Sequence, residues 1–285
     1  MDFIYNVIHW SGAENIFSIG SFGIRYYSMC WLLAFVVSYI LMLQIFKRET
    51  LVLATFKAGK PQDLLDKLTM YIFVGTILGA RLGHCLFYEF DYYSQNPLEM
   101  LLPFSSRSGS WEFTGFAGLA SHGGAIGIIT ALFLFARNTK INFVWLADRL
   151  VLVVPIAGAF IRIGNFFNSE IIGKAADPNL PWAVVFTRED NIPRHPGQLY
   201  EAVGYIILFI ILWAFYKKNQ NPKPGLLFGI FLVCLFSIRF FVEFFKENQE
   251  AFEDSMFINM GQLLSVPFIL AGLYLIFRPT TTKKV

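Results

Sequence analysis

LADRLVLVVPIAGAFIRIGNFFNSEIIGK, residues 146–174, is the stretch around which the rest of the chain is organised. An apolar run of helix length ends in Arg162, which is followed by two asparagines and Glu170, and the run is apolar enough to lie in a membrane. An arginine inside a membrane helix costs about 2.5–3.5 kcal/mol on insertion scales unless a partner or a polar cavity receives it. We therefore expect Arg162 to serve a ligand. Pro155, within the same run, predicts a kink in the helix.

The composition of the whole chain indicates the same class of protein. Of 285 residues, 55% are hydrophobic and only 15% are charged, whereas soluble domains carry about 25% charged residues. We therefore expect an all-α, polytopic membrane protein in which residues 1–285 form a single integral-membrane domain. The net charge of +3 does not indicate a nucleic-acid partner, because the basic residues are spread over the loops.

Seven apolar runs have about the 20 residues that a helix needs to cross the hydrocarbon core. Their approximate limits are 23–46, 69–90, 116–136, 143–165, 198–216, 225–245 and 261–278. We therefore predict a bundle of seven transmembrane helices over about residues 23–278. Residues 1–22 lack the basic start of a signal peptide and are expected to form an amphipathic segment on the membrane surface. The apolar side chains of this segment are Phe3, Ile4, Ile8 and Trp10.

Loop charges predict the orientation of these spans. Basic residues concentrate after the first, third and fifth spans and in the tail, residues 279–285; they are Lys47, Arg48, Lys57, Lys60, Lys67, Arg137, Lys140, Lys217, Lys218, Lys223, Lys283 and Lys284. The loops on the other side carry fewer, among them Lys174, Arg188, Arg194 and Lys246. The positive-inside rule therefore predicts a cytoplasmic C-terminal tail and an N-terminal segment at the outer face.

With this orientation, nearly every unusual polar residue of the spans falls in their outer halves. These residues are Arg25, Tyr26, Tyr27, Arg81, His84, Tyr88, His122, Arg162, Asn165, Asn168, His195, Gln198, Tyr200, Glu201, Arg239 and Glu243. A site for a phospholipid headgroup would require such placement, whereas a solute channel would scatter polar residues through both halves.

Two of the arginines have a polar residue one helical turn away. Arg162 and Asn165 are three residues apart and share a helical face. Arg239 and Glu243 are four residues apart, and they either form an ion pair that braces the helices or form a functional pair in which Glu243 orients Arg239. We favour the functional interpretation, because two guanidinium groups from different helices can grip one phosphate.

Other polar residues are open to more than one interpretation. Arg81 could bind the same phosphate, or it could pair with Glu89 or with the interface. His122, followed by two glycines, is either a hydrogen-bonded structural residue or a neutral imidazole that acts as a general base. His195, which precedes a proline, is expected to organise a loop. No metal-binding or nucleotide-binding motif occurs in the sequence, so neither a metal nor a cofactor is expected.

Glycines in the second predicted span indicate close helix packing. Gly75, Gly79 and Gly83 recur every four residues and therefore lie on one face. A neighbouring helix can approach such a face closely, so we expect these glycines to serve packing rather than binding.

The motifs RIGNFFNSEIIG, SHGG, HPGQLYE, RFFVEFFKE and NMGQLLS lie on or beside the predicted spans. Together they resemble the bacterial phosphatidylglycerol–prolipoprotein diacylglyceryl transferase family, over about residues 21–277. The resemblance implies transfer of diacylglyceryl from phosphatidylglycerol to the lipobox cysteine of a preprolipoprotein signal peptide, with release of glycerol phosphate. It also implies a multi-pass protein of the bacterial plasma membrane, in contact with the lipid bilayer, with its active site towards the outer leaflet.

This reaction assigns catalytic roles to the candidate residues. A thiolate must attack an sp³ carbon, so a base must remove the thiol proton, and His122 is the candidate. Arg162 and Arg239 are expected to stabilise negative charge on the leaving phosphate. Asn165 and Glu243 are expected to orient these two arginines.

The remaining candidates are expected to bind substrate. Tyr27 matches a tyrosine that the family carries on its first span, and Glu170, Gly173 and the HPGQLYE segment are expected to shape the headgroup pocket. A transporter for an anionic solute is the alternative, because it would also bury arginines. Such a transporter should show inverted repeats and broken helices, and the sequence shows no internal repeat.

Overall fold

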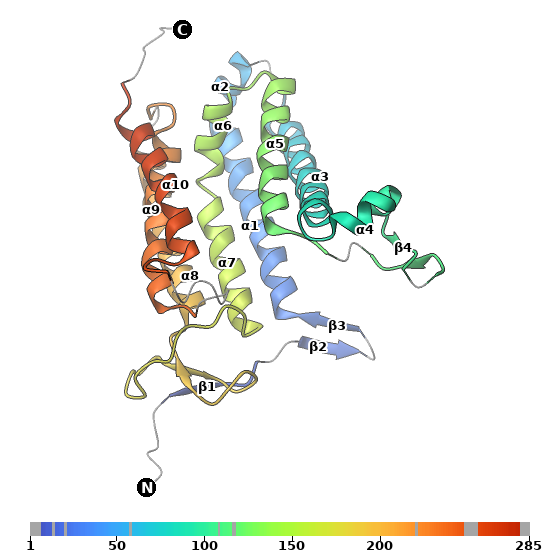
Figure 1. Ribbon diagram of the computed structural model, residues 1–285. Coiled ribbons are helices and arrows are strands. Elements are labelled where there is room, and N and C mark those ends of the chain that lie inside the picture. The colour runs from blue at the N-terminus through green and yellow to red at the C-terminus, as the bar shows by residue number, and fades with distance from the viewer. Residues whose placement is uncertain are drawn as a thin grey trace. The chain divides into compact units, whose positions relative to one another are not determined.

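The computed structural model of the chain is mostly helical (Figure 1). It describes residues 7–12, 15–19, 22–56, 59–107, 109–115, 118–219, 222–247 and 256–279. The longer helices are α1 (Tyr26–Arg48), α3 (Pro61–Phe87), α5 (Ser121–Thr139), α6 (Phe143–Leu150), α7 (Val154–Phe167), α8 (Gly197–Lys218), α9 (Leu226–Val242) and α10 (Met260–Phe277). The shorter ones are α2 (Thr50–Thr55), α4 (Phe90–Gln95) and the 3-10 helices η1 (Pro97–Met100) and η2 (Glu243–Phe245).

The helices confirm a multi-pass membrane protein. Five of those described are long and apolar enough to cross a membrane, namely α1, α3, α8, α9 together with η2, and α10. The pair α6 and α7 makes a sixth candidate if it is counted as one bent span. The third predicted span, 116–136, falls on α5, which is not among these candidates. The count of seven spans therefore remains a prediction.

The kink predicted at Pro155 is confirmed. The axes of α6 and α7 differ by 45°, and the break lies between Leu150 and Val154. Pro155 occupies the first turn of α7, where its missing N–H costs no helical hydrogen bond. The proline therefore starts a new helix direction, and this second helix carries Arg162 and Asn165.

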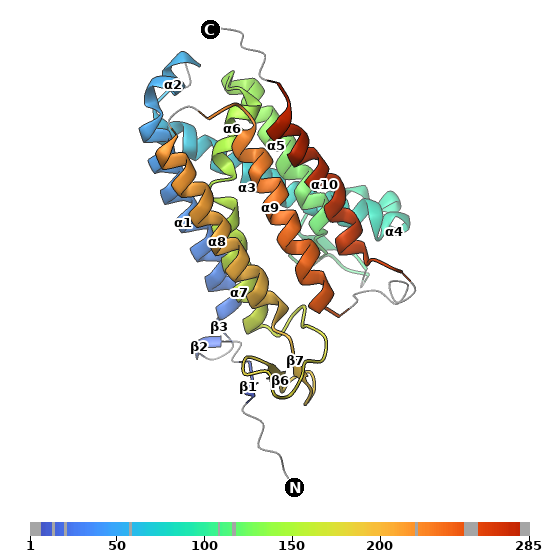
Figure 2. The ribbon, with the colours of Figure 1, turned by 90° about the vertical axis from the view of Figure 1, so that its left-hand side faces the viewer.

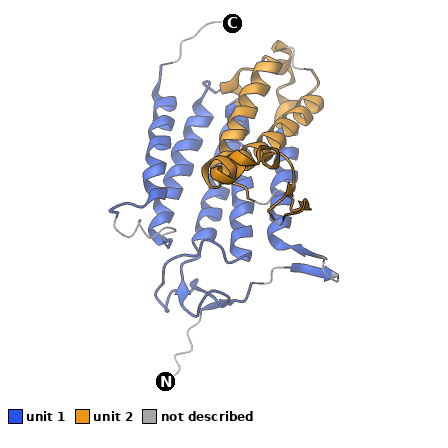
Figure 3. Ribbon diagram, turned by 45° about the vertical axis from the view of Figure 1, so that its right-hand side comes forward, with its two compact units in different colours: residues 1–42, 147–285 blue, residues 43–146 orange. Residues whose placement is uncertain are grey.

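The chain divides into two compact units, which are coloured separately in Figure 3. Unit 1 consists of residues 1–42 and 147–285, and unit 2 consists of residues 43–146. Within unit 1, α7 packs against α8, α8 against α9, and α9 against α10 (Figure 2). Within unit 2, α3 packs against α5. The single integral-membrane domain remains a prediction.

The all-α prediction left out several short strands. In unit 1, β1 (Ile8–Trp10), β6 (Val184–Phe186) and β7 (Pro193–Arg194) form a sheet in the order β1-β6-β7, in which β1 is parallel to β6 and β7 antiparallel to it. A hairpin of β2 (Asn15–Ile19) and β3 (Phe22–Arg25) leads into α1. In unit 2, β4 (Phe104–Ser105) pairs with β5 (Glu112–Phe113). Such short strands are missed because they leave no periodic pattern in the sequence.

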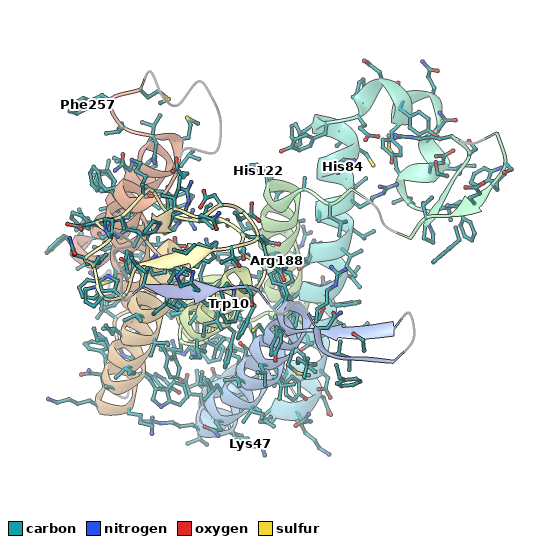
Figure 4. All side chains as sticks on the ribbon, turned by 90° about the horizontal axis from the view of Figure 1, so that it is seen from below. Trp10, Lys47, His84, His122, Arg188 and Phe257 are labelled. Atoms are coloured by element: carbon teal, nitrogen blue, oxygen red, sulfur yellow. The ribbon has the colours of Figure 1, made fainter. Side chains whose placement is uncertain are left out.

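Trp10, which was predicted to lie on the membrane surface, packs against the end of α7 in unit 1. Its ring centroid lies 5.0 Å from that of Phe166 at the end of α7, and Figure 4 labels it. The pairing of β1 with β6 sets this position, and the place of the segment on the membrane surface stays a prediction. Ile8 is 50% exposed, while Phe3 and Ile4 lie outside the described residues.

A buried carboxylate joins α6 to the start of α9 within unit 1. Asp148 accepts hydrogen bonds from the backbone N–H groups of Gly225, at 2.7 Å, and Phe228, at 2.9 Å. These groups belong to the first turn of α9, where a negative charge also interacts favourably with the helix dipole. Asp148 therefore ties the helix that carries Arg239 to the segment that leads into α7.

The close packing predicted for Gly75, Gly79 and Gly83 is confirmed in unit 2. A Cβ atom added to Gly79 would lie 2.7 Å from the Cα of Gly127 on α5, and one added to Gly83 would lie 2.6 Å from the Cα of Gly123. Real Cβ atoms do not approach backbone so closely. The backbones of α3 and α5 are therefore in contact along this face, and any side chain there would force them apart.

We expect Gly123→Ala to destabilise the protein and Gly124→Ala, its neighbour on α5, to leave stability nearly unchanged. A Cβ at Gly123 would lie 2.7 Å from the Cα of Gly83, whereas one at Gly124 would make an ordinary 3.6 Å contact with Ala80 Cβ. Overpacking typically costs about 1–3 kcal/mol. Thermal unfolding of both variants in detergent checks this, and equal midpoints would contradict the packing account.

Candidate functional site

A buried carboxylate, that of Glu201 on α8, is the centre of a charged cluster in unit 1. The Glu201 side chain is 0% exposed. Arg162 Nε lies 2.7 Å from Glu201 Oε2, and Lys246 Nζ lies 3.1 Å from Oε1. Arg239 Nη1 lies 3.9 Å from the same Oε1. Cations from α7, from α9 and from the residue after η2 therefore converge on one carboxylate.

Helical spacing explains why Glu201 points into this cluster. Gln198, Glu201, Ala202 and Tyr205 are all buried and follow one another at intervals of three, one and three residues, so they share one face of α8. The Tyr205 hydroxyl lies 3.5 Å from Glu201 Oε1. The buried face of α8 therefore holds a row of polar groups among the helices that carry the arginines.

Arg162 is oriented from two sides. Its Nη1 donates to Asn165 Oδ1 at 3.3 Å, which confirms that these two residues share a face of α7. Asn165 Nδ2 in turn donates to Glu170 Oε2 at 2.7 Å. Arg162 Nε and Glu201 Oε2 form a close ion pair. The geometry of this contact is not that of a hydrogen bond, since Glu201 Oε2 accepts none among the described residues.

The segment after α7 folds tightly against this chain of contacts. Ser169 and Ile171 both have a φ of 56°, a backbone conformation that costs non-glycine residues on the order of 1 kcal/mol or more. Glu170 lies between them and accepts a second hydrogen bond, from Asn168 Nδ2 at 3.0 Å. Gln198 donates to the backbone carbonyl of Glu170. Glu170 is thus held in place by α7 and α8 together.

Gly173 is needed where two backbone segments meet. An added Cβ would lie 2.7 Å from the carbonyl oxygen of Phe245, and Gly173 forms an isolated β-bridge with Lys246. The Gly173 carbonyl also accepts a hydrogen bond from Arg194 Nη1 at 2.9 Å. In this structure Gly173 therefore positions the backbone of Lys246, whose side chain reaches Glu201.

Among the described ion pairs, Glu243 contacts Lys246 rather than the predicted Arg239, and its role in orienting Arg239 stays a prediction. Glu243 Oε1 accepts from Lys246 Nζ at 3.1 Å, and its Oε2 accepts from Asn259 Nδ2 at 3.4 Å. Among the ion pairs of the described residues, Arg239 contacts Glu201 instead. The reason is local, because α9 ends at Val242 and Glu243 begins the 3-10 helix η2. In a 3-10 helix the side chains of residues i and i+3 lie above one another, so Glu243 is aligned with Lys246.

Glu201 was expected among the polar residues of the outer halves but not as the centre of the cluster, and Lys246 was expected in a loop. Lys246 is 2% exposed. The available signal was the pattern Glu243-Phe-Phe-Lys246, whose spacing of three suits a tight turn after a helix. The second partner of Lys246 is Glu201, which lies 45 positions away in the sequence, so local spacing could not predict this contact.

The cluster has an excess of positive charge. Three cations, Arg162, Arg239 and Lys246, face two carboxylates, Glu201 and Glu243, which leaves one positive charge uncompensated within these ion pairs. The side chains of Arg162 and Arg239 are 15% and 31% exposed. An uncompensated charge in a poorly hydrated place is costly, and a bound anion would offset that cost. The two guanidinium groups suit a phosphate, whose oxygens match their planar fork.

Tyr27 lies on α1 at its contact with α7. A Cβ added to Gly164 of α7 would lie 2.9 Å from Tyr27 Cδ2 and 3.2 Å from Cys30 Cβ. Gly164 is two residues beyond Arg162 in the same helix. The close approach therefore places the Tyr27 ring against the turn of α7 that carries Arg162.

His122 belongs to unit 2, whereas the charged cluster belongs to unit 1. It is an exposed residue in the first turn of α5, and Figure 4 labels it together with His84 of α3. Its role as a base stays a prediction.

The described hydrogen bonds of Arg81 go to backbone carbonyls, and its binding of a phosphate stays a prediction. Its Nη2 donates to the carbonyl of Glu99 at 2.7 Å and its Nε to that of Met100 at 3.2 Å. Glu89 is paired with Arg107 and lies 3.5 Å from His84 Nε2. Arg81 therefore joins α3 to η1 within unit 2.

His195 organises the loop before α8, as predicted. Its Nδ1 lies 2.9 Å from the hydroxyl of Tyr200, which also accepts from Trp182 Nε1 at 2.9 Å. Burial lowers the pKa of His195, so the ring is neutral at pH 7. Within the described part of the chain, no group of three or more His, Cys, Asp or Glu residues could hold a metal ion.

Similarity to known proteins extends over nearly the whole chain. The family model for prolipoprotein diacylglyceryl transferase matches residues 14–278. The phosphatidylglycerol–prolipoprotein diacylglyceryl transferase of Bacteroides fragilis is 43% identical over 272 residues, which cover 95% of this chain and 94% of that protein. The enzyme of the same name from Tolumonas auensis is 42% identical over 278 residues, covering 97% and 99%. The one from Chloroherpeton thalassium is 38% identical over 273 residues, covering 95% and 94%.

Proposed function

The chain belongs to the prolipoprotein diacylglyceryl transferase family, and we propose that it transfers diacylglyceryl from phosphatidylglycerol to the lipobox cysteine of a preprolipoprotein signal peptide. A carbon–sulfur bond forms, the bond from the glycerol carbon to the phosphate oxygen breaks, and glycerol phosphate leaves with the electron pair. The observation that carries the proposal beyond family membership is the one excess positive charge in the cluster of Arg162, Arg239 and Lys246. Negative charge develops on the leaving phosphate, and fixed cations stabilise it without reorganising.

Arg162 and Arg239 are proposed as the phosphate ligands. Arg162 is held through Nε by Glu201 and through Nη1 by Asn165, so its fork is set before the substrate arrives. Arg239 has a longer contact with Glu201, of 3.9 Å, and a more exposed side chain. One fixed and one accessible arginine would together grip two phosphate oxygens.

The other unit 1 candidates are proposed to act on substrate binding through these arginines. Glu170 fixes Asn165 from the side opposite Arg162. Glu243 acts on the cluster through Lys246, and Gly173 positions the Lys246 backbone. Tyr27, which packs on α7 beside Arg162, is proposed to line the headgroup pocket.

His122 is proposed as the general base for the thiol. A neutral imidazole has a ring nitrogen able to accept the thiol proton. The support is the exposure of His122 at the start of α5, where a substrate can reach it.

We also propose seven membrane spans, an outer N-terminal segment and a cytoplasmic C-terminal tail. Lys47 and Arg48 end α1, and Lys217 and Lys218 end α8. The positive-inside rule assigns these helix ends to the cytoplasm. Glu201 lies near the start of α8, at the end opposite Lys217 and Lys218, and Arg162 of α7 contacts it there. The site would therefore face the outer leaflet of the bacterial plasma membrane.

Mass spectrometry of a single turnover tests the activity. Purified protein in phosphatidylglycerol vesicles should add one diacylglyceryl mass to a lipobox peptide and should leave the same peptide with serine in place of cysteine unchanged. The bent α6–α7 pair is a feature that a transporter for an anionic solute would also have. No mass gain, together with uptake of an anionic solute into the vesicles, would replace the transferase with this alternative.

A further inference from the structure

Unit 1 holds an apolar groove that the proposed chemistry does not use. Its volume is about 500 Å³, and its lining includes Ile8, Phe166, Trp182, Leu199 and Val203. Ligand sites in proteins usually measure about 300–1,000 Å³. The groove is therefore large enough for several side chains of a binding partner.

The groove lies beside the charged cluster, on the other side of α8. Leu199 and Val203 are four residues apart on one face of α8, whereas Gln198 and Glu201 belong to the buried face. On α7, Phe166 of the groove directly follows Asn165 of the cluster. A ligand in the groove would therefore lie across α8 from Glu201 and next to the turn of α7 that carries Asn165.

Part of the groove wall lies outside the membrane-crossing helices. Ile8 belongs to β1, and Trp182 precedes β6; they are 50% and 53% exposed. Val203, on α8, is 56% exposed. The acyl chain of a lipid stays in the hydrocarbon and gains little from a wall made of strand and loop residues. Exposed apolar patches mark sites for proteins, membranes or ligands, and the strand and loop residues in this wall favour a polypeptide.

Hydrogen bonds and ring contacts connect the side chains around the groove. The Tyr200 hydroxyl accepts a hydrogen bond from Trp182 and contacts His195 Nδ1, each at 2.9 Å. The Tyr200 ring also packs on Phe245, with 5.8 Å between ring centroids. A wall ordered in this way lowers the entropy cost of binding an apolar segment.

We propose that this groove binds the apolar residues that precede the acceptor cysteine of the prolipoprotein, and that it thereby presents the thiol beside Arg162 and Arg239. The inference rests on the proposed function. A secretory signal peptide has an apolar stretch of about 7–15 residues followed by small residues at its processing site. Such a segment can follow α8 from the membrane onto the β1-β6 surface, with its cysteine at the level of the cluster.

The test compares Val203→Gln with Ile210→Gln, a matched change on α8. Both residues are apolar and similarly exposed, at 56% and 57%, but only Val203 lines the groove. In the transfer assay, Val203→Gln should raise the KM for a lipobox peptide about tenfold, as expected when a polar group replaces an apolar contact. Its kcat and its KM for phosphatidylglycerol should stay within about twofold of the unmodified protein, the pattern of lost ground-state binding. Ile210→Gln should change none of them.

The outcomes separate the inference from the proposed function. If the unmodified protein transfers no diacylglyceryl group, the proposed function fails. If it does transfer, an unchanged peptide KM in Val203→Gln overturns the groove assignment, and so does a raised KM for phosphatidylglycerol alone, which would assign the groove to lipid.

Cross-linking keeps the test valid if Val203→Gln does not fold. A photoreactive benzoylphenylalanine in place of Ile8 should capture a lipobox peptide whose cysteine is serine, and the same group in place of Ile210 should not. This readout needs no turnover. Equal capture at both positions, or none at Ile8, would overturn the inference.

Discussion

Arg162→Lys and Arg239→Lys should each reduce diacylglyceryl transfer about 10²–10³-fold, while the protein still inserts and folds. Arg162 already uses Nε for Glu201 and Nη1 for Asn165, and its planar fork still has N–H groups for a phosphate oxygen. Lysine offers one point charge and cannot make these contacts together. Loss of one fixed donor to a developing phosphate charge costs on the order of 3–4 kcal/mol, which corresponds to this change in rate.

Transfer should be measured in membranes, with the amount of each variant determined by blotting. Arg81→Lys is the matched control, because Arg81 is a buried arginine that binds the carbonyls of Glu99 and Met100 in unit 2. Its turnover per folded molecule should stay within about threefold of the unmodified protein. Near-normal turnover by both site variants would exclude the phosphate clamp. Loss of the protein itself would show that these arginines brace the helices.

Glu201→Gln should lower the free energy of unfolding by about 3–5 kcal/mol, the usual cost of removing one partner from a buried ion pair. The substitution keeps the shape of the side chain but leaves three cations facing one carboxylate, that of Glu243. We expect transfer to fall as well, because Arg162 loses the group that holds its Nε. Thermal unfolding in detergent and the transfer assay measure the two effects.

A second substitution distinguishes charge balance from shape. Glu201→Gln combined with Lys246→Met leaves two cations and one carboxylate, which is the same excess charge as in the unmodified protein. Most of the lost stability should return, whereas transfer should stay low because Arg162 is still unsupported. Glu99→Gln is the control, since Glu99 is equally buried but is bonded to Ser106 and Tyr92 rather than to cations. A double variant no more stable than Glu201→Gln alone would contradict the charge account.

Features that depend on a few neighbouring residues could be predicted from the sequence. The break before Pro155, the shared face of Arg162 and Asn165, and the close approach at Gly79 were all predicted correctly. Each follows from backbone geometry that repeats every three or four residues, or from the ring of a proline. The membrane class followed in the same way, because the length and apolarity of a helix are properties of one segment.

Partners that are distant in sequence could not be predicted in this way. Glu201 contacts cations from α7, from α9 and from the residue after η2. No pattern in the sequence near Glu201 predicts these partners. The hydrogen bonds from Arg81 to the backbone carbonyls of η1 were not predicted either, because they join residues 18 and 19 positions apart.

The ion pair of Glu243 depends both on local backbone geometry and on tertiary packing. Helical spacing alone favoured Arg239, but the change to a 3-10 turn at Glu243 brought Lys246 into place. Local sequence determined which segments are helices, which faces are polar and where a helix bends, because those properties repeat along one element. The tertiary structure decided which buried charge meets which, because a buried ion pair is stable only when packing brings both partners to the same place and excludes their alternatives.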